Sequence, residues 1–153
     1  MITTNRTDSG NADFQALVRE LDHDLSIRDG EDHAFYAQFN KTGSLAHAMV
    51  AYEDASPIGC GALKKYSDDT MEVKRMYVAP HKRRQGMAAT ILSALEAWTR
   101  ELGYKKCILE TGKNQPEAIA LYKKCGYTII PNYGQYKGID NSVCFERSLI
   151  PAP

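Results

Sequence analysis

The segment 71–110 places a strand, a basic loop, a helix and a second strand in direct succession. Apolar residues alternate over 71–78 and stop before Pro80, which predicts a strand. Apolar residues then recur at helical spacing over 84–102, and 106–110 is a short apolar run. Two strands joined through one helix form a parallel pair with a right-handed crossover. We therefore expect a β-sheet in which the strands at 71–78 and 106–110 run parallel to each other.

The rest of the chain adds an antiparallel meander before this segment and two strands after it. Turn residues at 53–57 and 67–69 separate three successive strands, which pair antiparallel when their connections are this short. We therefore expect an α/β (α+β) architecture, a mixed and mostly antiparallel sheet with helices on both faces. The expected strands are 2–6, 45–53, 57–66, 71–78, 106–110, 127–130 and 142–149, and the expected helices are 12–27, 31–40, 84–102 and 116–125.

The length of the chain favours a single domain, and its net charge argues against some classes of binding protein. The 153 residues suit a single domain, which can bury a core without a disulfide or a metal. Lys plus Arg and Asp plus Glu both number 19, and this neutral balance argues against a nucleic-acid or membrane-surface binder. Because we find no signal peptide and no apolar run of membrane-spanning length, we expect a cytoplasmic location.

The cysteines and histidines show no metal-site pattern. None of the four cysteines forms a CxxC pair, and the four histidines lack ligand spacing, so we expect no metal. We expect the cysteines to be buried in a reducing compartment, since free cysteine behaves as a small hydrophobic residue.

The loop between the strand at 71–78 and the following helix has the features of a phosphate site. Lys82, Arg83 and Arg84 attract a polyanion, and Gly86 stands near the start of the helix. The first N–H groups of a helix have no partner inside it, and the helix dipole adds positive potential there. The alternative is a solvated basic turn before a surface helix, since short glycine motifs occur by chance.

Three segments resemble the Gcn5-related N-acetyltransferases (GNAT superfamily). The run RRQGMA at 83–88 resembles the R/Q-x-x-G-x-G/A signature of that family. The segments RMYVAP at 75–80 and AIALYKKCGY at 118–127 resemble further motifs of the family, in the same order. The resemblance covers about 45–149 and is far more specific than the basic loop alone.

The resemblance implies both a fold and an activity. It implies one N-acetyltransferase domain over 1–153, with an acetyl-CoA-binding core at about 70–130. It also implies a sheet that splays apart between the parallel strands ending at Val78 and Glu110, with the thioester of acetyl-CoA in the opening. The activity implied is transfer of an acetyl group from acetyl-CoA, as co-substrate, to a primary amine of a small molecule, peptide or protein by direct attack in a ternary complex.

The resemblance further implies how acetyl-CoA is held. The backbone of Met76 and Val78 pairs with the pantetheine arm, and the amides of 84–89 hold the pyrophosphate. Tyr122 places its hydroxyl near the thioester sulfur, and Gln115 stands where the family usually has Asn. The residues expected to bind acetyl-CoA are Met76, Tyr77, Val78, Arg83, Arg84, Gln85, Gly86, Met87, Ala88, Ala89, Asn114, Gln115 and Tyr122.

Glu72 is the first candidate for the catalytic base that acetyl transfer to an ammonium requires. Histone acetyltransferases of the resembled superfamily carry their catalytic glutamate at the equivalent place. Period-two alternation of the strand predicts Glu72 on the same face as Met76 and Val78. The alternative is a surface carboxylate that pairs with Lys74 or with a neighbouring strand.

Glu110 and Tyr122 are the other catalytic candidates. Glu110 ends the strand across the splay, where it can face the acceptor; the alternative is a structural partner for Arg75 or Lys106. Tyr122 is the candidate general acid toward the departing thiolate, and the alternative is an aromatic ring that only packs in the core.

The acceptor is expected near the Gly- and Tyr-rich loop that joins the last two strands. Tyr133, Tyr136 and Lys137 are the candidate acceptor contacts, and the alternative is a plain surface connection. The cations Lys74, Arg75 and Lys137 suggest an acceptor that bears a carboxylate.

Two other functions compete with the enzyme. One is a non-catalytic acyl-CoA-binding sensor module, which would use the same cleft without transfer. The other is a nucleic-acid-binding domain built on the cations at 82–84, but three cations on a neutral protein are too few for tight binding. We therefore expect acetyl-CoA and an amine as partners, with no nucleic acid and no membrane. Members of the resembled family are often dimers, so a homodimer is a further expectation.

Overall fold

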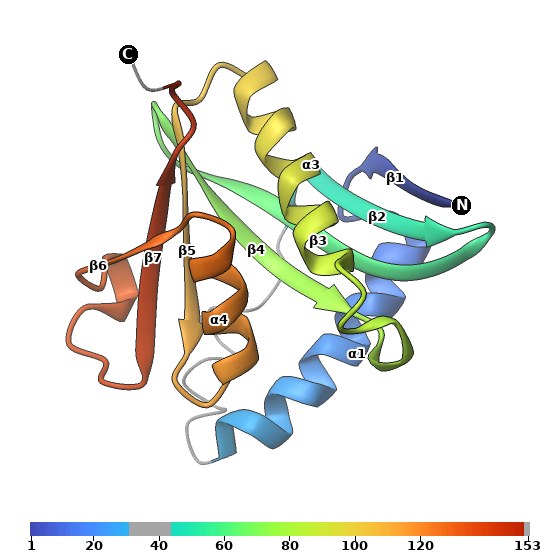
Figure 1. Ribbon diagram of the computed structural model, residues 1–153, viewed down its shortest axis with the longest axis horizontal. Coiled ribbons are helices and arrows are strands. Elements are labelled where there is room, and N and C mark those ends of the chain that lie inside the picture. Colours follow the sequence, from blue (N-terminus) through green and yellow to red (C-terminus); the bar gives the residue numbers. More distant parts are fainter. Residues whose placement is uncertain (31–43, 152–153) are drawn as a thin grey trace.

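The computed structural model describes residues 1–30 and 44–151, so the helix expected over 31–40 lies outside the described residues. The strands are β1 (Ile2–Thr7), β2 (His47–Glu53), β3 (Ser56–Ser67), β4 (Thr70–Val78), β5 (Lys106–Gly112), β6 (Thr128–Ile130) and β7 (Ser142–Ser148). The helices are α1 (Ala12–Asp29), α3 (Met87–Glu101) and α4 (Pro116–Lys124), with 3-10 turns at Pro80–Lys82 and Gly134–Tyr136. The strands form one seven-stranded sheet in the order β1-β2-β3-β4-β5-β7-β6 (Figure 1).

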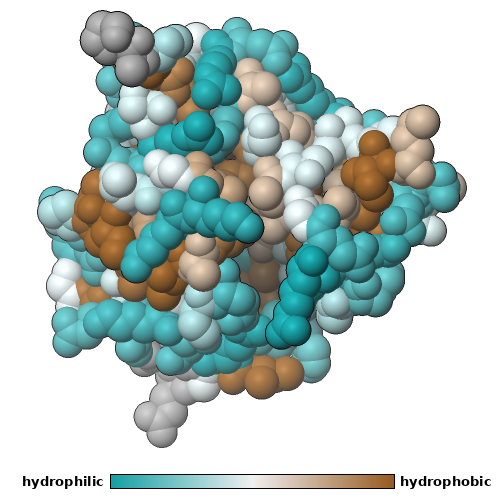
Figure 2. Space-filling view, in the orientation of Figure 1, coloured by the Kyte–Doolittle hydropathy of each residue, from teal (hydrophilic) through white to brown (hydrophobic). Residues whose placement is uncertain are grey.

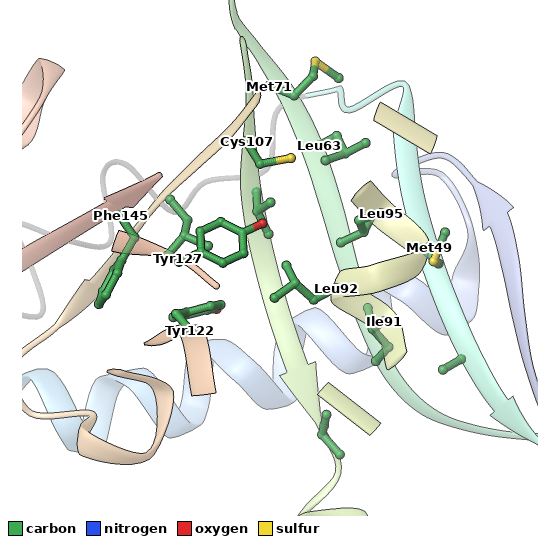
Figure 3. Close-up of a cluster of buried hydrophobic side chains, with 14 of the residues drawn as sticks. Met49, Leu63, Met71, Ile91, Leu92, Leu95, Cys107, Tyr122, Tyr127 and Phe145 are labelled. Atoms are coloured by element: carbon green, nitrogen blue, oxygen red, sulfur yellow. The ribbon is translucent and has the colours of Figure 1, made fainter. Parts of the chain in front are cut away.

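Both faces of this sheet are covered by helices. Along β2, Ala48 and Val50 are buried in a cluster with α1, whereas Met49 and Ala51 are buried in a cluster with α3. Because neighbouring residues of a strand point to opposite faces, α1 and α3 lie on opposite sides. The α3 cluster continues under α4 (Figure 3), and its labelled members are Met49, Leu63, Met71, Ile91, Leu92, Leu95, Cys107, Tyr122, Tyr127 and Phe145. The predicted α/β architecture is confirmed.

The helices begin and end at residues suited to those places. Asn11 accepts a hydrogen bond of 2.9 Å from the backbone N–H of Phe14 and so caps α1. Pro116 occupies the first turn of α4, where its missing N–H has no helical partner to lose. Gly103 and Gly126 follow α3 and α4 with φ of 90° and 91°, a left-handed conformation that glycine adopts without strain. Within residues 1–30 and 44–151, no helix is both long enough and apolar enough to cross a membrane.

The sheet opens between its two parallel strands. Strand β4 pairs with β5 only from Thr70 to Glu72, against Lys106 to Ile108. Beyond this point β5 stays paired with β7 as far as Gly112, while β4 stays paired with β3. The two strands therefore diverge toward the end at which α3 begins (Figure 1), and the predicted splay is confirmed.

A β-bulge in β4 makes one prediction wrong. Between two paired positions, β3 advances by two residues and β4 by three, and Arg75 takes a left-handed φ of 58°. Met71 and Val73 pack in the α3 cluster before the bulge, and Met76 and Val78 pack there after it. Regular alternation is broken at Arg75, so Glu72 does not share a face with Met76 and Val78.

Helix α3 also begins later than expected, at Met87 rather than at residue 84. Arg84 and Gly86 have φ of 65° and 81°, so both are left-handed and neither can continue a right-handed helix backward. The chain therefore bends at Arg84 and Gly86, and the first turn of α3 lies at the opening in the sheet.

Candidate active site

A cleft of about 960 Å³ lies where β4 and β5 diverge. Figure 2 shows a hollow near the centre of this face, with hydrophobic residues at its bottom and hydrophilic residues along its rim. Residues of α1, β4, β5 and α4 and of the first turn of α3 line the cleft. The lining includes residues from both faces of the sheet, the face that α1 covers and the face that α3 covers. The cleft therefore passes through the opening in the sheet.

One end of the cleft is formed by the backbone at the start of α3. The first hydrogen bond of this helix joins the N–H of Thr90 to the carbonyl of Gly86, so the N–H groups of residues 87–89 have no partner within the helix. Gly86 provides no side-chain cap, and a Cβ built on it would meet open space. These donors and the helix dipole fit a phosphate group.

The basic loop beside these donors is partly held by the protein itself. Arg83 donates from Nε to the carbonyl of Val78 at 2.8 Å, and its guanidinium carbon lies 5.4 Å from the centre of the Tyr77 ring. Lys82 forms an ion pair with Glu53. Of the three loop cations expected to attract phosphate, Arg84 is the one that the described residues leave without an ion-pair partner.

The structure brings together most of the residues expected to bind acetyl-CoA. Eleven line the cleft: Met76, Tyr77, Val78, Arg83, Arg84, Gly86, Met87, Ala88, Ala89, Gln115 and Tyr122. Gln85 and Asn114 do not line it, and they instead donate to the backbone carbonyls of His81 and Arg28, each at 3.3 Å. Gln115, not Asn114, is therefore the side-chain amide that reaches the cleft.

Tyr122 comes to the cleft from α4 and is almost fully buried. Its ring lies 5.9 Å from the ring of Tyr127 and 5.8 Å from that of Phe145, so it also packs in the core. Burial raises the pKa of the Tyr122 hydroxyl above its usual range, and the nearby Cys125 and Glu110 raise it further. The hydroxyl therefore stays protonated at neutral pH and can donate a hydrogen bond into the cleft.

The carboxylates of Glu72 and Glu110 line the same cleft from β4 and β5. Glu72 is 6% exposed. One oxygen, Oε2, accepts a hydrogen bond of 2.6 Å from the hydroxyl of Tyr133, and the other, Oε1, lies 3.8 Å from Nζ of Lys74. Glu110 occupies β5 two residues before its end and stands opposite Cys144 of β7.

The loop between β6 and β7 is more than a surface connection. Tyr133 and Tyr136 are buried against Ile108 and Cys144, and their rings meet edge to face with centres 5.7 Å apart. Burial raises the pKa of Tyr133, and the hydrogen bond to Glu72 raises it further. Tyr136 lines the cleft, whereas Lys137 is exposed and does not line it.

Sequence reasoning missed the contact between Tyr133 and Glu72. It offered Tyr133 as an acceptor contact and Glu72 as the catalytic base, with a pairing of Glu72 to Lys74 or a neighbouring strand as the alternative. The two residues are 61 positions apart, so no local spacing could reveal the hydrogen bond. The only signal was the concentration of tyrosines in a loop next to an apolar strand.

Comparison with known proteins agrees with this geometry. The model of the acetyltransferase (GNAT) family matches residues 14–127. The chain is 33% identical over 102 residues to the IAA acetyltransferase of Azospirillum brasilense, an alignment that covers 66% of this chain and 67% of that protein.

Solved structures share the fold over nearly the whole chain. A protein of Klebsiella pneumoniae assigned as an acyl-CoA N-acyltransferase has a TM-score of 0.81 at 29% identity, over 98% of this chain and 99% of that one. A GNAT family acetyltransferase of Elizabethkingia anophelis, solved with acetyl-CoA bound, has a TM-score of 0.67 at 19% identity, over 96% and 97%. The chain therefore belongs to the acetyltransferase (GNAT) family, and acetyl transfer from acetyl-CoA is its class of reaction.

Proposed function

We propose that the protein acetylates a primary amine that binds beside Glu72 and Glu110 while acetyl-CoA occupies the α3 side of the cleft. The observation that carries this proposal is a single cleft lined by the first turn of α3, by Tyr122 and by Glu72. The two carboxylates that would bind the amine and the backbone N–H groups that would bind the phosphates thus lie in the same cleft. A primary amine of a small molecule, peptide or protein fits this arrangement.

When bound, acetyl-CoA supplies the acyl group: a C–N bond forms to the neutral amine, the C–S bond breaks, and coenzyme A leaves as a thiolate. The ammonium loses two protons in all, of which one ends on the sulfur and the other in solvent. The protein must therefore take up a proton before the attack and stabilise the departing sulfur after it.

Glu72 is proposed as the base. Its carboxylate is buried in the cleft and fixed by Tyr133, so it offers an acceptor in one orientation. Glu110 lies on the neighbouring strand and supplies a second negative charge that attracts an ammonium. Two carboxylates in the same cleft support an amine rather than an alcohol as the acceptor.

Tyr122 is proposed to stabilise the departing sulfur as a hydrogen-bond donor. An unperturbed thiol has a pKa of about 8.5 and a phenol of about 10. Because burial raises the pKa of Tyr122 still further, complete transfer of its proton to a thiolate is unfavourable. A donated hydrogen bond with the proton retained on Tyr122 fits these pKa values better than general acid catalysis.

The test is the release of thiol from acetyl-CoA with a panel of primary amines, amino acids and lysine-containing peptides. We expect an amine-dependent rate that Glu72→Gln lowers by about 10²- to 10⁴-fold, the usual share of a general base. Tyr122→Phe should lower kcat and leave the affinity for acetyl-CoA unchanged. Glu146→Gln and Tyr104→Phe are matched controls, since neither residue lines the cleft.

Acetyl-CoA binding without thiol release across the whole panel would contradict the enzyme and support a sensor module. Normal rates in Glu72→Gln and Tyr122→Phe would contradict the roles of Glu72 as base and Tyr122 as hydrogen-bond donor. The proposal that the protein acetylates an amine would still stand. The homodimer and the cytoplasmic location stay predictions, which light scattering after size-exclusion chromatography and cell fractionation would test.

A further inference from the structure

The cations around the cleft differ in how they are neutralised. Arg75 is held by Asp22 at 2.5 Å, and Arg83 lies 3.5 Å from Asp24. Lys82 and Arg28 pair with Glu53 and Glu117. These four side chains already have a carboxylate at contact distance, although Nε of Arg75 is buried without a hydrogen-bond partner among the described residues.

Lys74 is the exception among the buried cations. Its side chain is 12% exposed and lines the cleft, and its nearest carboxylate oxygen is Glu72 Oε1 at 3.8 Å. This distance is too long for a hydrogen bond. Within the part of the chain that the structure describes, no hydrogen bond joins Lys74 Nζ to an acceptor. An ammonium has three donors, so Lys74 can donate hydrogen bonds to a ligand in the cleft.

We propose that Lys74 binds a carboxylate of the acceptor, which makes the substrate an amino acid or another amine with a carboxylate a few bonds from the nitrogen. This inference rests on the proposed function, since it names the acceptor class of the same site. Glu72 and Lys74 lie two residues apart before the bulge, on one face of β4 and about 6–7 Å apart along the strand. A compact zwitterion can reach both.

The charges of the site alternate when such a zwitterion binds. Its ammonium faces the carboxylates of Glu72 and Glu110, and its carboxylate faces Lys74. When Glu72 accepts the proton, its carboxyl becomes neutral and Lys74 loses the closer of the two negative charges. A carboxylate on the acceptor keeps the buried ammonium neutralised at that step, whereas a simple amine does not.

Two further observations agree with this assignment. Burial lowers the pKa of Lys74, so a carboxylate brought into contact would favour its charged form. Lys137, the other lysine that the sequence offered for a carboxylate, is exposed and lies outside the cleft lining. Of these two lysines, Lys74 is therefore the one that an acceptor in the cleft can contact.

The experiment compares matched pairs of amines that differ by one carboxylate: tyrosine with tyramine, histidine with histamine, lysine with cadaverine, and β-alanine with ethylamine. We expect a higher kcat/KM for the carboxylate-bearing member of at least one pair, by about 10- to 100-fold, the range of one hydrogen bond between charged groups. Lys74→Met should remove this preference by lowering kcat/KM for the acid only. Lys74→Arg should retain it in part, and Lys137→Met should leave it unchanged.

Each outcome decides the inference. Equal or better turnover of the simple amines, or an unchanged preference in Lys74→Met, would overturn it and leave the proposed function standing. Absence of thiol release with every pair would contradict both. Acetyl-CoA affinity and melting temperature of each variant serve as the folding control, and Lys74→Arg keeps the test valid if Lys74→Met fails to fold.

Discussion

The hydroxyl of Tyr133 lies 2.6 Å from Oε2 of Glu72, and this hydrogen bond ties the loop after β6 to the middle of the sheet. Both side chains are buried, with exposed fractions of 8% and 6%. The ring of Tyr133 also meets that of Tyr66 edge to face, with centres 5.2 Å apart. Tyr133 is thus fixed at its ring and at its hydroxyl, and it can hold the carboxylate in one orientation.

Tyr133→Phe should therefore lower kcat by about 10-fold, because it removes a hydrogen bond to a charged group but keeps the ring. KM for acetyl-CoA should not change, since Tyr133 is not among the residues that line the cleft. Tyr66→Phe is the matched control and should keep both constants. A rise in KM for acetyl-CoA with unchanged kcat would contradict a role through Glu72.

The left-handed glycine before α3 offers a second test. Gly86→Ala meets no steric clash, but a left-handed alanine costs about 1–2 kcal/mol, and relief of that strain would shift the first turn of α3. KM for acetyl-CoA should rise several-fold. Gly103→Ala carries the same kind of strain at the other end of α3, with φ of 90° and open space around the Cβ.

Thermal unfolding and acetyl-CoA titration of the two glycine variants separate strain from binding. Both should lose stability by a similar amount, and only Gly86→Ala should bind acetyl-CoA more weakly. Equal affinity in the two variants would contradict the assignment of the α3 amides to the phosphates.

Much of the fold followed from local patterns in the sequence. Residues 12–27 and 116–125 have helical apolar spacing with suitable end residues, and the described helices α1 and α4 agree with them to within two residues. The parallel pairing of β4 with β5 followed from the strand, helix, strand succession, and the antiparallel meander before it followed from its short turns. The residues named for the cofactor and the chemistry largely meet in one cleft for the same reason, since they lie where these elements end.

The parts that failed depend on contacts across the fold. The bulge lies at Arg75, which has a left-handed φ and whose guanidinium pairs with Asp22 of α1, 53 residues away. Arg84 is also left-handed, although its residue type gives no sign of it. Neither could be read from alternation or spacing, because a left-handed φ at an arginine has no signature in the local sequence.

A buried acidic residue of α3 should matter for stability and not for catalysis. Glu96 is 3% exposed and accepts hydrogen bonds from Tyr127 at 2.8 Å and from Arg147 at 2.7 Å, which joins α3 to the second half of the sheet. Glu96→Gln should lower the free energy of unfolding by about 1–3 kcal/mol, because it removes the charge that Arg147 faces. Glu101→Gln is the control, since Glu101 lies on the same helix and pairs with the exposed Arg6. It should change the free energy of unfolding little.

Urea unfolding followed by the fluorescence of Trp98 would measure both variants, since it is the single tryptophan of the chain. The kcat of Glu96→Gln should equal that of the wild type at a temperature where both are folded. A large fall in kcat without loss of stability would place Glu96 in the active site instead.

Alkaline pH should destabilise the protein through its buried tyrosines. Burial raises the pKa of Tyr122, Tyr127, Tyr133 and Tyr136 above the usual value of about 10. Above that pH the unfolded chain loses phenolic protons that the native state keeps, so the unfolded state binds fewer protons. The free energy of unfolding must then fall as pH rises, by up to about 1.4 kcal/mol per pH unit for each such group.

Urea midpoints between pH 8 and pH 11 test this linkage, and the fall should begin near pH 10. Tyr127→Phe should make the slope shallower, because one shifted group is removed, even though the variant is less stable at pH 8. A flat profile up to pH 11 would contradict the raised pKa values of these tyrosines, and with them the argument that Tyr122 retains its proton when the thiolate leaves.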